Sequence, residues 1–186
     1  MAGGSAGVAG TARQRVLDAA LALFAEHGIS GTSLQMIADR IGVTKAAVYH
    51  QFPVKDDIAR GLLGDVFSSL EAVVVAAEAR PVGERHEAAI HGIVEMMLSQ
   101  RQVMVALYRD PEMERLVAED TVLSAIRARL DRVLNPPDAV DARRRRLGWA
   151  VIGAGFTRAV VDPQFADFPD EELKVELVEL AHRILG

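Results

Sequence analysis

Residues 31–53 read GTSLQMIADRIGVTKAAVYHQFP, and their pattern is the strongest structural signal in the chain. Two short runs have apolar residues at helical spacing, and Ile41-Gly42-Val43 separates them. Two short helices joined by a three-residue turn that contains glycine form a helix-turn-helix. We expect a supporting helix over 33–40 and a second helix over 44–50. Phe52-Pro53 should end the second helix, because the residue before a proline avoids helical backbone angles.

Two threonines are predicted to cap these helices. Thr32 precedes the first helix and Gln35 follows three residues later, which is the spacing of a capping box. Thr44 is expected to cap the second helix. That helix begins with Lys45, Ala46 and Ala47. Small or polar side chains of this kind are typical of a helix whose backbone lies deep in a DNA major groove.

Helical periodicity continues over the rest of the chain, whereas sustained alternation of apolar and polar residues is missing. We therefore predict an all-α protein of about nine helices, with an N-terminal three-helix unit and a C-terminal helical bundle. Residues 1–10 are expected to be a disordered tail, 11–54 a helix-turn-helix domain and 55–186 a second domain. The further predicted helices cover 11–27, 55–79, 84–99, 101–108, 112–134, 138–161 and 170–185.

The composition excludes several classes of protein. Half of the 186 residues are apolar and none is Cys, which removes disulfide scaffolds, cysteine-ligated metals and thiol nucleophiles. The longest uncharged apolar run, 147–157, is too short to cross a bilayer. The first ten residues lack the basic start of a secretory signal. No nucleophile elbow or phosphate loop occurs, so we expect a soluble, cytoplasmic protein that is not an enzyme and needs no cofactor.

The net charge of −5 argues at first against a nucleic-acid partner. The charge is unevenly distributed, however. Residues 1–60 contain six Lys or Arg and five Asp or Glu, whereas the remainder contains 15 basic and 21 acidic residues. The acidity therefore belongs to the C-terminal part, and the N-terminal unit remains able to approach DNA.

The N-terminal stretch also carries a recognisable pattern. Phe24-Ala25-Glu26 precedes a glycine, Gly31-Thr32-Ser33 opens the supporting helix, and Ile37-Ala38 is followed by Gly42-Val43. Tyr49-His50 then precedes Phe52 and Lys55. Over about residues 11–60 the chain resembles the DNA-binding domain of the TetR family of bacterial one-component transcriptional regulators. The C-terminal sequence carries no such signature, although its helical, aromatic-poor character is similar to that family's ligand-binding and dimerisation domain.

The resemblance implies roles for individual residues on a double-stranded DNA operator. Gln35, Lys45 and Ala46 would face bases, with Lys45 donating to guanine and the Ala46 methyl group touching a thymine methyl. The positions implied to hold phosphates are Ser33, Thr44, Tyr49, His50 and Lys55. Many relatives carry glycine or a hydroxyl residue where this chain has Ala46 and Ala47, which narrows the hydrogen bonds available to bases. Core packing between helices is an alternative role for Tyr49.

The resemblance further implies a homodimeric repressor that a small molecule releases from a near-palindromic operator, with the long helix from Lys55 as the lever. An activator of the same family would show the same residues. The residues expected to line the ligand pocket are Phe67, Met96, Met97, Met104, Leu107, Tyr108, Trp149 and Phe156. The last two helices are expected to form the dimer interface through Trp149, Ile152, Gly155, Leu173, Leu177, Leu180 and Ile184.

Two other groups of residues allow different functions. His91 and Glu95 lie four residues apart and, with His86, have a spacing that could ligate a metal in a metal-binding or enzymatic bundle. We favour a polar helix face instead and predict no metal site. Arg143–Arg146 is a run of four positive charges. Because consecutive residues point to all sides of a helix, we interpret it as a solvated surface with salt bridges rather than a second nucleic-acid patch.

Overall fold

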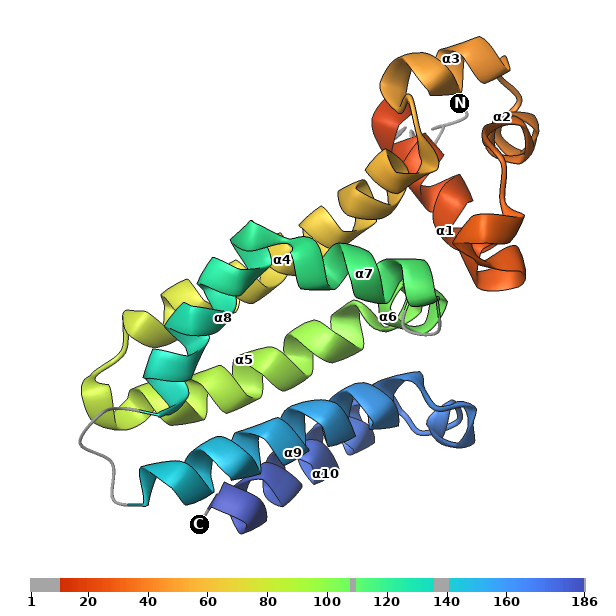
Figure 1. Cartoon of the computed structure of the whole chain (residues 1–186). Helices are drawn as coiled ribbons and strands as arrows, with labels where there is room; N and C mark the ends of the chain where they lie inside the picture. Colours follow the sequence, from red (N-terminus) through yellow and green to blue (C-terminus); the bar gives the residue numbers. More distant parts are fainter. Residues whose placement is uncertain (1–10, 108–109, 136–140, 186) are drawn as a thin grey trace, which may run out of the picture. The chain divides into compact units, whose positions relative to one another are not determined.

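A computed structural model describes residues 11–107, 110–135 and 141–185, and over these ranges the protein is helical with no strand. This confirms the all-α prediction. The chain divides into two compact units, one ending at Leu62 and the other beginning at Leu63 (Figure 1). The described α-helices are α1 (Ala12–Gly31), α2 (Leu34–Ile41), α3 (Lys45–Gln51), α4 (Lys55–Glu78), α5 (Arg85–Ser99), α6 (Arg101–Leu107), α7 (Pro111–Glu119), α8 (Thr121–Leu134), α9 (Ala142–Val161) and α10 (Asp170–Leu185). Two 3₁₀ turns, η1 (Val82–Glu84) and η2 (Pro163–Phe165), precede α5 and α10.

The described part of the chain contains ten α-helices rather than about nine, because the helix predicted over 112–134 is divided at Asp120. Asp120 has extended backbone angles and accepts a hydrogen bond on Oδ1 from the Leu123 amide at 2.8 Å. It therefore ends α7 and caps α8. The tail predicted over 1–10 and the helix start predicted at 138 lie outside the described residues.

The first unit packs α1, α2, α3 and the start of α4 around one apolar core. Ile37, Val48 and Ile58 are fully buried in it. Gly61 lets α4 approach α1, because a Cβ atom there would lie 3.0 Å from Leu17 Cδ2. The unit therefore continues past residue 54, the predicted domain boundary, and includes the first turns of α4.

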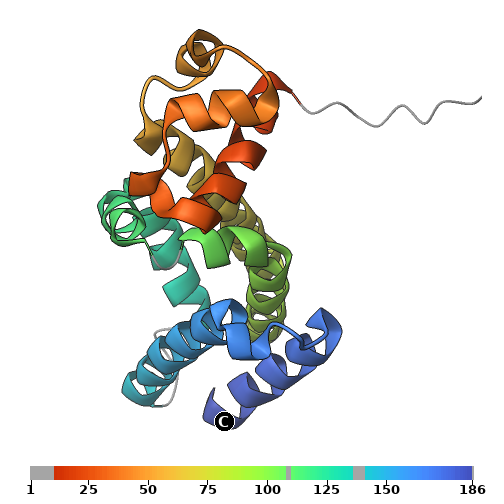
Figure 2. The ribbon, with the colours of Figure 1, turned by 90° about the vertical axis from the view of Figure 1, so that its right-hand side faces the viewer.

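In the second unit, α5 packs against α8, α9 and α10, and α9 also packs against α6 and α10 (Figure 2). The main core of this unit is formed by buried side chains of α5, α9 and α10. Its buried members are Ile90, Val94, Met97, Leu98, Ile152, Phe156, Val160, Leu173, Leu177, Val178 and Ala181. None of the helices described here is both long and apolar enough to cross a membrane.

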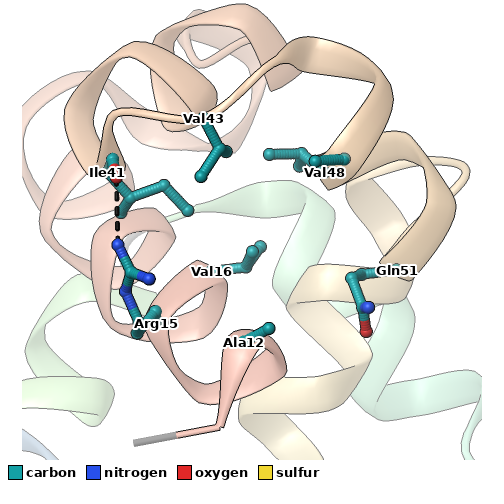
Figure 3. Close-up of a pocket in the computed structure, with 8 residues that line it drawn as sticks. Ala12, Arg15, Val16, Ile41, Val43, Val48 and Gln51 are labelled. Carbon is teal, nitrogen blue, oxygen red and sulfur yellow. Dashed lines mark hydrogen bonds between the residues drawn. The ribbon is translucent and has the colours of Figure 1, made fainter. Parts of the chain in front are cut away.

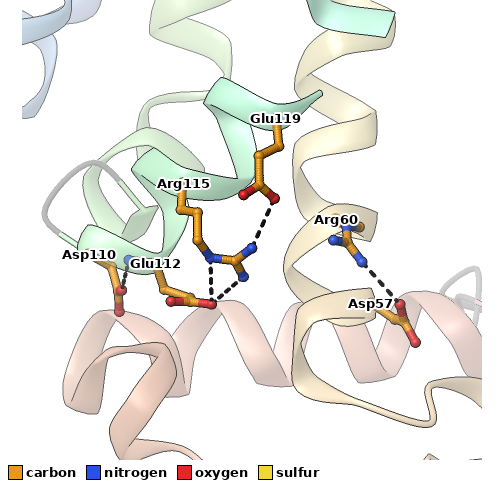
Figure 4. A network of polar contacts seen from close by, with 6 residues as sticks. All are labelled: Asp57, Arg60, Asp110, Glu112, Arg115 and Glu119. Carbon is orange, nitrogen blue, oxygen red and sulfur yellow. Dashed lines mark hydrogen bonds and ion pairs between the residues drawn. The ribbon is translucent and has the colours of Figure 1, made fainter. Parts of the chain in front are cut away.

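Polar contacts fix the short helices of this unit. The Arg101 guanidinium at the start of α6 donates to Val160 O at 3.0 Å, to Phe165 O at 2.7 Å and to Asp170 Oδ1 at 3.1 Å. At α7, Asp110 Oδ1 accepts from the Glu112 amide at 2.9 Å, and Arg115 bridges Glu112 and Glu119 (Figure 4). Arg101 thus joins α6 to the end of α9 and the start of α10.

Candidate nucleic-acid interface

The turn between α2 and α3 has the geometry that the sequence predicts. Gly42 has φ +69° and ends α2 in the left-handed region, where glycine carries no steric penalty. Thr44 caps α3 by accepting a hydrogen bond from the Ala47 amide at 3.2 Å, as predicted. Only residues 42–44 therefore separate the end of α2 from the start of α3.

The predicted capping box at α2 is wrong. Ser33, not Thr32, caps α2, since its hydroxyl accepts from the Met36 amide at 3.2 Å. Thr32 is buried, and its hydroxyl donates toward Gly28 O at 2.8 Å and Leu23 O at 3.3 Å. Gln35 instead donates to Asp39 Oδ1 at 2.7 Å. The Thr32 hydroxyl is thus used inside the unit, where it bonds one carbonyl at the Gly28 kink of α1 and one carbonyl before it.

Helix α3 presents nearly all of its side chains to solvent. Val48 is the fully buried residue of α3, whereas Lys45, Ala46, Tyr49 and His50 are exposed. These four residues follow the i, i+1, i+4, i+5 spacing of one helix face. Tyr49 is 57% exposed, so core packing does not explain it. The outward face of α3 is thus an exposed surface of small, aromatic and basic side chains.

The opposite side of α3 is held against α1. Val16, Val43 and Val48 face one another in a hollow between α1, the turn and α3 (Figure 3). At its edge Arg15 donates to Ile41 O at 3.1 Å, which ties α1 to the end of α2. Arg13 lies over the Phe52 ring at 5.1 Å. These contacts fix the orientation of α3 within the first unit.

Lys55 has a different setting from the one predicted. Its ammonium group donates to Ile29 O at 2.8 Å and to Ser30 O at 3.2 Å, the carbonyls at the end of α1. Carbonyls at a helix C-terminus lack partners within their own helix and favour a cation. Lys55 therefore caps the end of α1 in this structure, and its contact with a phosphate stays a prediction.

Most other cations of the first unit are also engaged within it. Arg40 pairs with Glu26 at 3.1 Å, and Arg60 lies 3.8 Å from Asp57 (Figure 4). Within residues 11–62, Lys45 is the lysine or arginine for which the structure gives no polar or aromatic partner. Lys45 is therefore the lysine or arginine of residues 11–62 that is most available to an external partner.

The structure brings together most of the residues predicted to line a ligand pocket. Met97 and Phe156 are buried in the core of the second unit, and Met96, Met104 and Trp149 pack against it. Phe67 is buried on α4 but is not a member of this cluster. The Leu107 side chain and Tyr108 lie outside the described residues.

The predicted dimer interface needs correction. Ile152, Leu173 and Leu177 are buried in the core of their own chain, so they cannot meet a second copy. Trp149 also packs against that core. Gly155, Leu180 and Ile184 are exposed, as an interface requires. The prediction failed because an apolar stripe marks a buried face without showing which partner covers it.

The sequence reasoning missed two exposed apolar residues of α9. Leu147 is 67% exposed and Val151 is 54% exposed, and they lie one turn apart. Gly148 packs against Leu185 and Ile184 of α10, which places this part of α9 beside the end of α10. The i, i+4 spacing of Leu147 and Val151, opposite the buried Ile152, is the signal that would have identified them.

The residues considered for a metal have other partners. His91 pairs with Glu87 at 2.9 Å, Glu95 pairs with Lys174 at 3.5 Å, and the His86 ring packs edge-on against Trp149. Among the described residues no group of three His, Asp or Glu side chains could hold an ion. In the arginine run, Arg146 pairs with Asp131 at 3.4 Å. Arg143, Arg144 and Arg146 are exposed, while Arg145 is half-buried.

Three comparisons place the chain among known proteins. The family model described as bacterial regulatory proteins, tetR family, matches residues 16–62. The transcriptional repressor KstR2 of Rhodococcus jostii is 32% identical over 115 residues, which cover 58% of this chain and 53% of KstR2. The repressor LfrR of Mycolicibacterium smegmatis is 27% identical over 156 residues, covering 79% of this chain and 78% of LfrR.

The fold of the whole chain agrees with these similarities. The crystal structure of Mycobacterium smegmatis AmtR superimposes with a TM-score of 0.67 at 27% identity and covers 98% of this chain and 90% of AmtR. The chain spans only about half the length of KstR2, so the match to that repressor is concentrated in one part. The helix-turn-helix geometry and the family model agree that residues 16–62 belong to the TetR family of bacterial regulatory proteins.

Proposed function

We propose that this protein is a sequence-specific DNA-binding transcriptional repressor that a small molecule releases from its operator. The outward face of α3 carries this proposal, because its only buried side chain is Val48 while Lys45, Ala46, Tyr49 and His50 are exposed. A helix of this kind fits the major groove. Lys45 would donate to guanine and Ala46 would touch a thymine methyl group. Gln35 would contact a neighbouring base, and the Ser33, Thr44, Tyr49 and His50 side chains would hold phosphates.

The DNA contacts can be tested on a sequence selected by the protein itself. Binding sites are selected from random DNA, and affinity for the recovered site is measured by fluorescence anisotropy. The double variant Lys45→Ala, Tyr49→Phe should fold normally and bind the site at least tenfold more weakly. Arg60→Ala removes a partly exposed charge elsewhere in the unit and serves as the control, with affinity expected within about twofold. Parent-like affinity of the double variant would show that α3 is not the recognition helix.

A homodimer is the expected active form, because one α3 reads too few base pairs for a unique site. Two copies would place their recognition helices one DNA turn apart, about 34–36 Å. The exposed face formed by Leu147, Val151, Leu180 and Ile184 supports this assembly. Gly155 is exposed beside it, and a Cβ atom at that position would have no neighbouring atom within 4 Å, so a partner helix can approach closely.

This interface can be tested by charge substitution. Leu147→Glu combined with Ile184→Glu should give a monomer in sedimentation velocity and weaken operator binding. Val175→Glu is the matched control, because Val175 is 56% exposed but lies on the opposite side of α10 from Leu180 and Ile184. A double variant that remains dimeric would exclude this face.

Release by a ligand follows from thermodynamic linkage. A molecule that prefers a conformation with low DNA affinity lowers the affinity for DNA, by the same factor by which bound DNA lowers the affinity for that molecule. The methionine-lined core around Met96, Met97, Met104, Trp149 and Phe156 is our proposed place for the ligand, because methionine side chains adapt to varied shapes. We propose that α4 transmits the conformational change to the helix-turn-helix, since its first turns belong to the first unit and the rest to the second. Its DNA partner would place the protein in the cytoplasm, and no enzymatic role is proposed.

A further inference from the structure

One end of the second unit is rich in arginine. The last turns of α4 and α8 and the first turns of α5 and α9 meet there, since Ala77, Ala89, Val133 and Leu134 form one buried cluster with Trp149 against it (Figure 1). We call this region the basic end. Its cations are Arg80, Arg85, Arg132, Arg143, Arg144, Arg145 and Arg146.

The positive charge of the basic end is only partly neutralised. Arg146 pairs with Asp131, and Arg85 and Arg132 lie near enough to Glu78 to lower its pKa, although the hydrogen bond from Arg129 is the main cause of that shift. Within the described part of the chain, Arg143 and Arg144 have no carboxylate at ion-pair distance. The second unit as a whole is acidic, with 15 basic and 21 acidic residues. The concentration of arginine at its basic end is therefore a local feature that needs a local explanation.

At the basic end three buried nitrogen atoms have no hydrogen-bond partner among the described residues. They are His86 Nε2, Arg145 Nε and Trp149 Nε1, and all three are sealed from solvent. Arg145 and Trp149 lie one turn apart on α9 and so share a face. The His86 ring packs edge-on against Trp149 with 5.5 Å between ring centres. Three unsatisfied nitrogens therefore occur together where α5 meets α9.

Such groups are rare in folded proteins, because a buried donor loses its hydrogen bonds to water and gains none in return. The Arg145 Nε and Trp149 Nε1 groups can only donate, so the chemistry they lack is an acceptor. Burial, and then the nearby Arg145 charge, lower the pKa of His86, so the arginines are the main source of positive charge at the site. A negatively charged oxygen is the acceptor that arginine binds most strongly.

The same residues border the main core of the unit. Trp149 and Ile93 pack both against the buried cluster of the basic end and against the core that contains Met97 and Phe156. A molecule whose charged head reaches Arg145 would therefore have apolar side chains beside its body. We propose that Arg145, Trp149 and His86 bind the oxyanion head group of an amphipathic small molecule, a carboxylate or a phosphate ester. This rests on the proposed function in one respect, since it names the chemistry of the effector.

Trp149 is the only tryptophan of the chain, so its fluorescence reports on this site directly. The protein is titrated with octanoate, octyl phosphate, octanol and inorganic phosphate. The proposal predicts a saturable change in fluorescence with octanoate, with octyl phosphate or with both. Octanol and inorganic phosphate should have no effect at the same concentrations. Comparing octanoate with octyl phosphate then shows which head group the site binds. Equal responses to octanol would show apolar binding alone, and a response to inorganic phosphate alone would show only a basic surface. Either result, or no response, overturns the proposal.

Variants locate the head group, with affinities measured by calorimetry so that the tryptophan can be replaced. Trp149→Phe keeps a ring but removes the N–H group, and Arg145→Gln removes the charge. Each should weaken binding of the responding amphiphile at least tenfold, whereas Arg144→Gln, an exposed neighbour, should change it less than twofold. Equal losses in Arg144→Gln and Arg145→Gln would overturn the assignment. Because these titrations need no DNA, failure of operator binding would contradict the proposed function and leave this site standing.

Discussion

Lys55 offers the sharpest test of how the first unit is built. The family resemblance assigns it to a phosphate, whereas the structure places its ammonium against Ile29 O at 2.8 Å and Ser30 O at 3.2 Å. The substitution Lys55→Met keeps the length of the apolar stem and removes the three donors. If Lys55 closes the end of α1, the variant should lose stability while its electrostatic contribution to DNA binding changes little.

The magnitude follows from the two contacts. Hydrogen bonds that involve a charged group contribute about 1.5–3 kcal/mol, and losing the cation removes one donor from Ile29 O, which still accepts from the Thr32 amide, and one from Ser30 O. We expect a loss of about 1.5–3 kcal/mol, which lowers Tm by roughly 3–12 °C for a chain of this size. One of the two bonds is exposed to solvent, which favours the lower part of this range.

The assay pairs thermal unfolding with the salt dependence of DNA binding. Lys45→Met is the matched control, since Lys45 is exposed and should change the free energy of unfolding by less than about 0.5 kcal/mol. It should weaken operator binding, whereas Lys55→Met should keep the slope of log affinity against log salt close to that of the parent. The reasoning fails if Lys55→Met leaves Tm unchanged and reduces that slope by about 0.9 per recognition helix, the effect of one lost phosphate contact.

Four further substitutions test the packing and charges of the second unit. Gly64→Ala should raise Tm because nothing lies within 4 Å of the new methyl group, whereas Gly92→Ala should lower Tm because its Cβ would meet Val73 at 2.7 Å; equal increases would contradict this. The Arg129 hydrogen bond lowers the pKa of Glu78, so its stabilisation is present above the unfolded-state value of about 4.3 and is lost as pH falls through the lower folded-state pKa. The Tm difference between the parent and Glu78→Gln is expected to be a few degrees at most at pH 7. It should shrink as the pH falls below the unfolded-state value and Glu78 takes up a proton, and a difference that stays constant with pH would refute the assignment. Arg101→Lys should cost about 2–4 kcal/mol in urea unfolding, because an ammonium cannot reproduce the three-way guanidinium contact, and a loss below about 0.5 kcal/mol would refute it.

The helix-turn-helix could be predicted because its signals are local. Gly42 ends α2, Thr44 begins α3, and Val48 is buried within a run of outward-facing residues. Thr32 shows the limit of local reasoning, since its spacing to Gln35 fits a capping box but its hydroxyl bonds carbonyls at and before the kink at Gly28. A sequence pattern does not show which buried carbonyls elsewhere compete for a hydroxyl group.

The second unit was harder to predict because its apolar residues have two possible partners. Leu173 and Leu177 share a stripe with Leu180, yet the first two are buried in the chain's own core while Leu180 is 43% exposed. Hydrophobic periodicity identifies a face of α10 but does not separate its buried centre from its exposed edge. That distinction depends on where α5 and α9 lie, which no local pattern in α10 contains.

The distribution of charge in the first unit bears on how it meets DNA. Of its six Lys and Arg residues, Arg15 and Lys55 donate to carbonyls, Arg40 and Arg60 face carboxylates, and Arg13 lies over an aromatic ring. Lys45 on α3 is thus the main free cation within residues 11–62. Phosphate neutralisation supplies much of the affinity of strongly basic DNA-binding proteins and makes that affinity salt-dependent. In the proposed complex α3 brings little such charge. The proposal therefore assigns most of the affinity to the fit of a small-residue helix in the groove, to backbone and hydroxyl donors, and to the second copy of the proposed dimer.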